Sequence, residues 1–318
     1  MARRPRSWIA IYAILAVLWG SSFAFIKTAL ASFTPLGLSL GRMLLAAATL
    51  LAICAVTRTP LPPRRLWGWL AIAALMATVM SWTLVAWAQT YISSVLAAIV
   101  TSSVPLWTLL VILVFFREER PTRSRVVGLL LGFVGILVVV GVWRGLGAAT
   151  LLGVLGAFAG CFAFAASIPF TRHFLTGSDS DGSSGTGLTR LSPLSLAAGL
   201  FVFAVIETAP FALFTDVVHA DITVSAVLAL IAVGCLSSGI AYVLNYRLIQ
   251  LTDSTTASTV MYAAPLVAIG VGTLFLGEAV TWNEPVGCVL ILLGAALAQN
   301  LIWPLRRTPA ASIESAAD

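Results

Sequence analysis

The sequence predicts an all-α membrane protein with ten transmembrane helices, arranged as two five-helix repeats of inverted topology. The composition, a succession of long apolar runs and a repeated segment each support this prediction. Of the 318 residues, 60% are hydrophobic and only 9% are charged, and the mean hydropathy is +1.03. Because a soluble domain carries about 25% charged residues, this composition indicates a chain that lies in a membrane.

The apolar runs have the length that a membrane span requires. A hydrocarbon core of about 30 Å needs roughly 20 apolar residues in a helix. Ten such runs can be marked, at 8–30, 36–57, 66–89, 93–116, 124–143, 149–170, 192–214, 224–249, 255–277 and 284–303. The first run is too long for the core of a signal peptide and contains Lys27, so we expect a retained first helix.

A segment of the first half recurs 160 positions later in the second half. The stretch AAIVTSSVPLWTLLVILVFF, which begins at Ala97, corresponds to ASTVMYAAPLVAIGVGTLFL, which begins at Ala257. Each copy continues into a short turn with a glutamate, Glu118 in the first and Glu278 in the second, and then into another apolar run with two glycines. Such a repetition predicts two halves of similar structure.

The two repeats are expected to cover residues 8–143 and 149–303. The segment 175–190, LTGSDSDGSSGTGLTR, is rich in Gly, Ser and Asp and cannot bury an apolar face. It falls inside the second repeat, so we expect a flexible cytoplasmic loop there. The small and polar tail 304–318 is expected to be disordered and cytoplasmic.

The basic residues predict the orientation, because short cytoplasmic loops collect Lys and Arg. With the amino terminus inside, fifteen arginines fall in the inside segments and only Arg144 falls in an outside loop. Both termini of this multi-pass chain are therefore predicted to be cytoplasmic, in the cell (inner) membrane. Five helices per half is an odd number, so the second half runs through the membrane inverted. Inverted repeats are typical of secondary transporters, whose site lies between the halves near the membrane midplane.

Other classes of protein find less support. A membrane enzyme needs converging acids, histidines or cysteines in its spans, whereas His173 and His219 lie in loops and the four cysteines have no ligand spacing. A channel stays open, although no filter motif is present. We expect no enzyme activity, cofactor, metal or nucleic-acid partner. The expected partners are a small-molecule substrate, the lipid bilayer and a proton as candidate coupling ion, in a monomer or a homodimer.

Several of these features together resemble a known family. The stretch LWGSSFAFIKTAL from Leu18 to Leu30, Arg42 early in the second run, and the doubled pattern of proline, glutamate and paired glycines resemble the drug/metabolite transporter superfamily, in particular its bacterial ten-helix EamA family. The resemblance covers residues 8 to 303. It implies export or exchange of small amphipathic metabolites, such as amino acids and their derivatives. A multidrug efflux carrier of the same fold, with a larger aromatic cavity that contains an acid, is the alternative.

Pro105 and Pro265 lie at corresponding places in the two halves, each in the middle of an apolar run. A proline removes one backbone hydrogen bond and leaves a carbonyl unpaired, which membrane helices tolerate where the carbonyl is buried or beside water. Small polar residues precede both prolines: Thr101, Ser102 and Ser103 in one half, and Ser258, Thr259 and Tyr262 in the other. Paired interruptions indicate a binding site between the halves, and a simple packing kink is the alternative.

Three charges lie inside predicted helices, at about 5 to 10 Å below the outer surface. They are Lys27, Arg42 and Glu207. Charges in a span usually face a partner or a wet cavity, so these three are candidates for an ion-paired outer gate, while Lys27 and Arg42 have the alternative of reaching the headgroups. Glu207 is the candidate for proton coupling, because a carboxylate shielded from water can take up a proton near neutral pH.

The repeated acids Glu118 and Glu278 lie at helix ends, on opposite sides of the membrane. A carboxylate there can accept hydrogen bonds from the free amides of a helix start, so we expect helix caps, with a gate latch as the alternative. Aromatic faces with a few polar groups suit an amphipathic solute. The remaining cavity candidates, each with bundle packing as the alternative, are Trp82, Trp87, Tyr242 and Asn245.

Overall fold

The computed structural model describes residues 7–111, 114, 123–141, 143, 147–176, 192–219, 221–251 and 260–298. These residues are mainly helical and contain no β-strand; one isolated bridge pairs Phe33 with Val218. The elements are α1 (Ser7–Ala29), α2 (Pro35–Thr57), η1 (Arg64–Leu66), α3 (Trp67–Ala74), η2 (Leu75–Met80), α4 (Ser81–Ala88), α5 (Ser94–Thr101), α6 (Val104–Val111), α7 (Arg123–Val140), α8 (Ala148–Thr171), η5 (Arg172–Thr176), α9 (Pro193–Ala212), α10 (Val224–Ile231), η6 (Ala232–Ile240), α11 (Ala241–Leu251), α13 (Val260–Leu276) and α14 (Asn283–Ala298).

Within the described ranges, seven helical stretches are long and apolar enough to cross a membrane. They are Trp8–Ala29, Pro35–Thr57, Arg64–Ala88, Ser94–Val111, Ala148–Leu175, Pro193–Ala212 and Val224–Asn245. Three shorter apolar helices cover Val126–Val140, Ala263–Leu276 and Asn283–Leu297. The prediction of an all-α membrane protein is confirmed, while the count of ten spans stays a prediction.

Short polar residues define where several helices begin. The hydroxyl of Thr34 accepts a hydrogen bond from the third amide of α2, at 3.1 Å, and Pro35 takes the first helical position. Ser93, Ser192 and Thr223 cap α5, α9 and α10 in the same way. Because the first amides of a helix have no partner within it, these caps let the helices begin close to the membrane surface.

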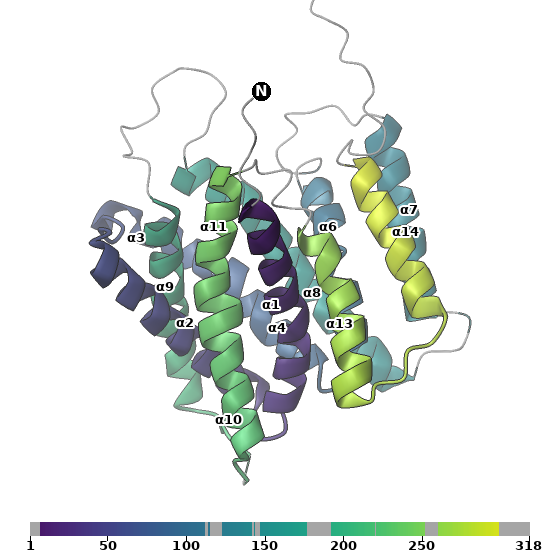
Figure 1. The fold of residues 1–318 in the computed structure, drawn as a ribbon, viewed down its shortest axis with the longest axis horizontal. Coiled ribbons are helices and arrows are strands. Elements are labelled where there is room, and N and C mark those ends of the chain that lie inside the picture. The colour runs from purple at the N-terminus through teal and green to yellow at the C-terminus, as the bar shows by residue number, and fades with distance from the viewer. Residues whose placement is uncertain are drawn as a thin grey trace, which may run out of the picture.

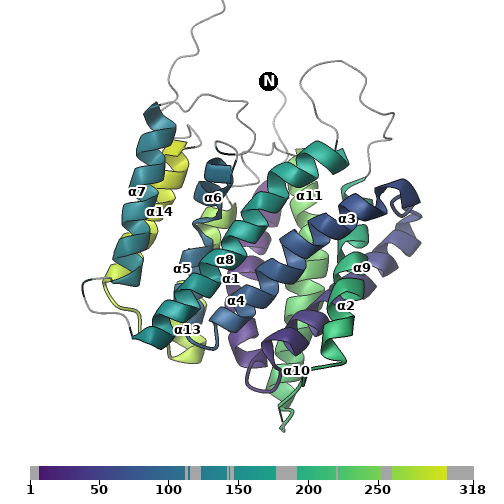
Figure 2. The same cartoon turned by 180° about the vertical axis from the view of Figure 1, so that it is seen from behind.

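The helices form one bundle in which α7 and α14 lie side by side at one edge (Figures 1 and 2). The four repeated glycines meet in this contact. A Cβ atom on Gly135 would lie 2.9 Å from the carbonyl oxygen of Gly287, and one on Gly294 would lie 2.6 Å from that of Gly128. The absence of side chains thus lets the two backbones approach closely, as small residues do between membrane helices.

Several contacts between the halves form matching pairs: a helix of the first half packs on one of the second, and the two corresponding helices also pack on each other. α1 packs on α13, and α8 packs on α6; α1 also packs on η6 and α11, as α8 does on η2 and α4. α2 contacts η6, and α9 contacts η2. Three helices of the first half pack directly on their counterpart in the second half: α2 on α9, α5 on α13, and α7 on α14. A two-fold relation between the halves would produce this pattern.

The helix that contains Pro105 is interrupted, whereas the helix that contains Pro265 is continuous. Ser102 and Ser103 form a tight turn between α5 and α6, and each hydroxyl donates to the carbonyl three residues earlier at 2.6 Å. Pro105 follows as the second residue of α6, where a missing amide hydrogen costs little. Pro265 lies inside α13. The two halves therefore differ in helix geometry at the prolines that the sequence repeats.

Two π-helical segments, η2 and η6, lie at corresponding places in the third and eighth predicted spans. A π turn adds a residue to the helical turn, and such turns are frequent at functional sites. η2 directly precedes Ser81 and Trp82 in α4, and η6 contains Ser237 and Ser238.

Several predicted features fall outside the described residues. They are Glu118, Ser258 and Thr259, the loop 175–190 beyond Thr176, and the tail 304–318. The backbone of Tyr262 is described, but its side chain is not.

Candidate functional site

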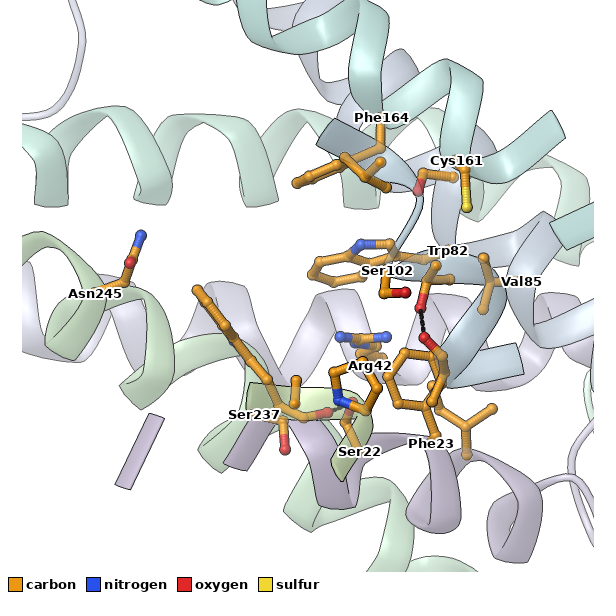
Figure 3. Close-up of a pocket in the computed structure, with 18 of the residues that line it drawn as sticks. Ser22, Phe23, Arg42, Trp82, Val85, Ser102, Cys161, Phe164, Ser237 and Asn245 are labelled. Carbon is orange, nitrogen blue, oxygen red and sulfur yellow. Dashed lines mark hydrogen bonds between the residues drawn. The ribbon is translucent and has the colours of Figure 1, made fainter. Parts of the chain in front are cut away.

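A cavity of about 240 Å³ lies in the middle of the bundle, between the two halves (Figure 3). The first half contributes α1, α2, α4, α5 and α6, and the second half contributes α8, η6, α11 and α13. The residues that line it are Trp19, Ser22, Phe23, Ile26, Arg42, Ser81, Trp82, Val85, Ala98, Thr101, Ser102, Val104, Cys161, Phe164, Ser237, Tyr242, Asn245, Ala264 and Pro265. Most of these side chains are apolar or aromatic, and Arg42 is the one charged residue among them.

Arg42 is buried, with 8% of its surface exposed. Its Cζ lies 3.6 Å from the centroid of the Trp82 ring, so the guanidinium stacks on the face of the indole (Figure 3). Nε donates a hydrogen bond of 2.8 Å to Oγ of Ser238. A stacked guanidinium gains a cation–π attraction that increases as water is excluded. Trp82 and Ser238 therefore hold the cation at the cavity wall.

Aromatic contacts fix Trp82 in turn. Its ring centroid lies 5.4 Å from that of Phe201 and 6.5 Å from that of Tyr242, and these two partners meet edge to face at 5.4 Å. Such tilted and T-shaped arrangements are the favoured geometries of aromatic pairs. The platform under Arg42 thus consists of residues from both halves of the chain.

Four of the cavity hydroxyls donate their protons to backbone carbonyls. Ser22 donates to the carbonyl of Trp19 at 2.6 Å, and Ser237 donates to that of Leu18 at 2.9 Å. Ser102 and Thr101 also donate to carbonyls of their own helix. Since a hydroxyl has one proton, these four groups offer acceptor lone pairs to a solute, whereas the guanidinium of Arg42 supplies several donors.

The structure brings together most of the predicted cavity residues. Trp82, Ser102, Tyr242, Asn245 and Pro265 all line the cavity. Arg42, which the sequence offered for a gate or for coupling, lines the cavity as well.

Two other candidates lie elsewhere. Trp87 is not among the lining residues; it packs edge to face on Tyr91 at 5.0 Å and against the backbone at Gly156. Pro105 does not line the cavity either, although Val104 beside it does. Each of these residues follows a lining residue on the same helix but points to another face.

Several lining residues were absent from the sequence-based candidates. Trp19, Ser22 and Phe23 belong to the motif LWGSSF, whose resemblance to a transporter motif was the available signal. Cys161 and Phe164 of α8 lie in an apolar run without any distinguishing pattern, so no sequence signal pointed to them.

Lys27 fixes the end of α1 that is predicted to lie outside. Its Nζ donates to the carbonyl oxygens of Gln89 at 2.6 Å and of Ile92 at 2.9 Å, in the connection between α4 and α5. A cation bound to the last carbonyls of a helix is favourably placed in the field of that helix. Lys27 therefore ties α1 to the neighbouring helices.

Glu278 caps a helix of the other half. Its carboxylate accepts hydrogen bonds from the amide of Ser94 at 2.8 Å, from the Ser94 hydroxyl at 2.8 Å and from the amide of Val95 at 3.0 Å. These groups form the start of α5, rather than of α14, which follows Glu278 in the sequence. The contact ties the turn after α13 to the predicted outer end of α5.

Glu207 lies on α9 and is not among the residues that line the cavity. Its Oε2 is buried without a hydrogen-bond partner among the described residues. No ion pair joins Lys27, Arg42 and Glu207, although the structure describes the side chains of all three. Lys27 instead donates to two backbone carbonyls, and Arg42 donates to the hydroxyl of Ser238.

A membrane bundle whose two halves together line a cavity is the architecture of a transport protein. The family model of EamA-like transporters matches residues 6–141 and 151–299. The chain belongs to the EamA-like transporter family, a branch of the drug/metabolite transporter superfamily, as its motifs predicted.

Individual proteins agree with this family. An uncharacterized transporter of Archaeoglobus fulgidus is 24% identical over 289 residues, which cover 91% of this chain and 97% of the relative. An uncharacterized transporter of Clostridium kluyveri is 23% identical, over 72% of this chain and 71% of the relative. A solved structure, titled only as the crystal structure of a protein, matches with a TM-score of 0.64 at 19% identity, over 94% of this chain and 99% of that chain. This last likeness concerns the fold alone.

Proposed function

We propose that this transporter exports or exchanges small amphipathic metabolites across the inner (plasma) membrane by alternating access. The observation that carries the proposal is the central cavity, which draws its lining from both halves of the chain. Its volume of about 240 Å³ is below the range of roughly 300–1,000 Å³ for drug-sized ligands. The described part of its lining also contains no Asp or Glu. Both features favour a small metabolite over the alternative, a multidrug efflux carrier.

The proposed mechanism uses two inverted repeats, 8–143 and 149–303, as the moving units. The matching pairs of contacts between the halves support this division. The arginine distribution supports cytoplasmic termini, with the second half inverted. Rocking of one repeat against the other around a fixed site is how inverted-repeat carriers expose that site alternately.

The predicted outer ends of the helices are bonded together in this structure. The contacts of Lys27 with the α4–α5 connection and of Glu278 with α5 both lie there. Further bonds join Ser32 to Thr223 and Thr34 to Asp216. We propose that this set of bonds breaks when the cavity opens to the outside, so that Lys27 and Glu278 act as an outer latch.

A proton stays a candidate coupling ion, with Glu207 as the acid that would carry it. Two features support this assignment: it is an acid inside a span, and its Oε2 has no hydrogen-bond partner among the described residues. Coupling through Glu207 would be indirect, because this residue does not line the cavity. Glu207→Gln is the test, and a variant whose transport keeps its dependence on pH would remove this role.

The decisive experiment combines two assays. Cells that express the protein are screened for resistance to toxic solutes and metabolite analogues, and the solutes found are measured in proteoliposomes of the purified protein, with and without a pH gradient. We expect accumulation of at least one small amphipathic solute that empty liposomes do not show. A purified, folded protein that transports none of the screened solutes would overturn the proposal.

A further inference from the structure

We propose that the central cavity recognises its solute by a carboxylate, and that Arg42 is the anion-binding residue. This inference rests on the transport function proposed above and names the substrate class, namely small organic acids with an apolar body. The charge of the cavity, the free hydrogen-bond donors of Arg42, the positioning of its side chain and the apolar remainder of the lining each support it.

The charge of the cavity is unbalanced. Arg42 contributes one positive charge, and none of the described residues that line the cavity is acidic and could neutralise it. A cation inside a membrane span is costly unless it has a partner or water beside it. An anionic solute in the cavity would supply the missing partner, and a cationic solute would be repelled.

The hydrogen-bond donors of Arg42 are largely unused. A guanidinium carries five N–H groups, and only the one on Nε has an acceptor among the described residues, namely Ser238. The four others belong to the two terminal nitrogens. These nitrogens present a planar fork that matches the two oxygens of a carboxylate. The hydroxyls of Ser22, Ser102 and Ser237 compete little for such an anion, because their protons are given to backbone carbonyls.

The direction of the fork is set by its neighbours. Stacking on Trp82 at 3.6 Å fixes the plane of the guanidinium. Ser238 accepts from Nε and donates its own proton to the carbonyl of Val233 at 2.9 Å, five residues earlier in the π-helical η6. The π turn thus orients the serine, and the serine orients the arginine. A side chain fixed in this way loses little conformational entropy when it binds an anion.

The rest of the cavity suits an apolar body. Phe23, Val85, Phe164 and Pro265 provide hydrocarbon and aromatic surface around the charged end. The volume of about 240 Å³ corresponds to roughly eight water molecules at about 30 Å³ each. A carboxylate with a side chain of the size of phenylalanine is therefore a suitable probe.

The experiment measures binding of radiolabelled 3-phenylpropanoate to the purified full-length protein at pH 7.5, where such an acid is ionised. The neutral amide 3-phenylpropanamide and the cation 3-phenylpropylamine, which have nearly the same size, compete with it. We expect the acid to bind at least about tenfold more tightly than the amide, as for a charge-assisted pair. The amine should compete less well than the amide.

Variants assign the preference to Arg42. Arg42→Gln should remove the difference between acid and amide, and Ser238→Ala should reduce it several-fold. Arg64→Gln is the matched control, because Arg64 also lies over a tryptophan, with Cζ 5.6 Å from the Trp67 centroid, but is exposed and outside the cavity. This control should keep the full preference.

Three results would overturn the inference. The first is an amide that binds as tightly as the acid in the unmodified protein, a comparison that needs no variant and therefore holds even where Arg42→Gln fails to fold. The second is a folded Arg42→Gln protein that retains the preference for the acid. The third is a failure of all three probes to bind the unmodified protein. In every case the transport function is judged separately, by the uptake of screened solutes into proteoliposomes.

Discussion

Two arginine–tryptophan pairs show how burial changes the consequence of the same contact. Arg64 lies over Trp67 at 5.6 Å and is exposed, so water solvates its guanidinium. Arg42 lies over Trp82 at 3.6 Å and is buried, so the indole and Ser238 replace part of that water. A buried cation with free donors is a site for an anion, whereas a solvated cation at the surface is not.

Trp82 and Trp87 provide a matched test of the cavity. Both lie on α4, about 140° apart around the helix, and only Trp82 lines the cavity. We expect Trp82→Leu to raise the KM of a transported solute by about five- to thirtyfold, because the cation–π platform of Arg42 is lost. Trp87→Leu should change KM by less than about twofold. The measurement is the uptake kinetics of both variants in proteoliposomes. Equal changes in KM in Trp82→Leu and Trp87→Leu would contradict the assignment of the cavity.

Glu278 provides a test of the outer latch. Glu278→Gln replaces a carboxylate that accepts three hydrogen bonds at the start of α5, at a cost of about 1–3 kcal/mol. We expect easier opening of the predicted outer side. The measurement is labelling by a membrane-impermeant maleimide of a cysteine at Val95, which is 1% exposed, in a chain without its four native cysteines.

Thr215→Val is the control for this labelling. The Thr215 hydroxyl donates to the carbonyl of Phe211, within the same turn at the end of α9, so its loss should leave the ends of the helices together. Labelling that stays unchanged in Glu278→Gln, or that rises equally in both variants, would exclude the latch.

The depth of a residue in the membrane is easier to predict than its partner. Trp82, Tyr242, Asn245 and Pro265 could be predicted as cavity candidates because all four lie well inside apolar runs. Trp87 satisfies the same criterion but faces away. The direction of the Trp87 side chain depends on η2, because one extra residue in a π turn rotates the following helix by about 100°. The composition of the run does not reveal the π turn. Likewise, the sequence predicted that Glu278 caps a helix, but not that the capped helix is α5 of the other half.

At the scale of the helix, the fourth predicted span is the least regular element. The proline rule predicts an interruption near Pro105, and the structure places it at Ser102 and Ser103, where α5 ends. The equivalent Pro265 lies in an unbroken α13, beside the cavity. The repeated proline therefore occurs in two different helix geometries, and the residues before it differ as well: Ser102 and Ser103 in one half, Tyr262 and Ala263 in the other.

The contact between α7 and α14 makes a quantitative prediction for its glycines. A Cβ on Gly135 would lie 2.7 Å from the backbone nitrogen of Ile291, so Gly135→Ala forces the two helices apart. We expect a loss of about 1–3 kcal/mol in the free energy of unfolding, seen as a lower melting temperature in detergent.

Gly270 supplies the matched control for this contact. It lies in α13, and a Cβ there would meet nothing within 4 Å. Gly270→Ala should leave the melting temperature unchanged or raise it, because alanine favours the helix. Equal losses of stability in Gly135→Ala and Gly270→Ala would show that close backbone approach does not hold α7 against α14.

For the whole molecule, the inverted repeat predicts a topology that fusions can measure. A reporter that is active only in the cytoplasm should be inactive when fused after Glu278 and active when fused after Thr59. The expectation follows from the basic residues, which gather on one side of the predicted membrane. Activity after Glu278 would contradict the inversion of the second half.

The overall architecture was the most predictable level of all. Each membrane span needs about 20 apolar residues, so the run 36–57 predicted α2 (Pro35–Thr57) almost to the residue, and 192–214 predicted α9 (Pro193–Ala212). The family followed from motifs along the whole chain. The contact between Arg42 and Ser238 could not be predicted from the sequence, because the two residues are 196 positions apart and each has many possible partners.

The buried charge of Arg42 has an electrical consequence for the proposed transport cycle. An empty cavity would carry one positive charge, whereas a bound carboxylate would make it neutral. Under alternating access, a membrane potential would act on the return of the empty carrier, and an inside-negative potential would draw the empty site back toward the cytoplasm. One charge moved across 100 mV is worth about 2.3 kcal/mol, which corresponds to roughly a fiftyfold concentration ratio. The voltage of the cell would thus sustain export of an organic anion, independently of any coupled ion.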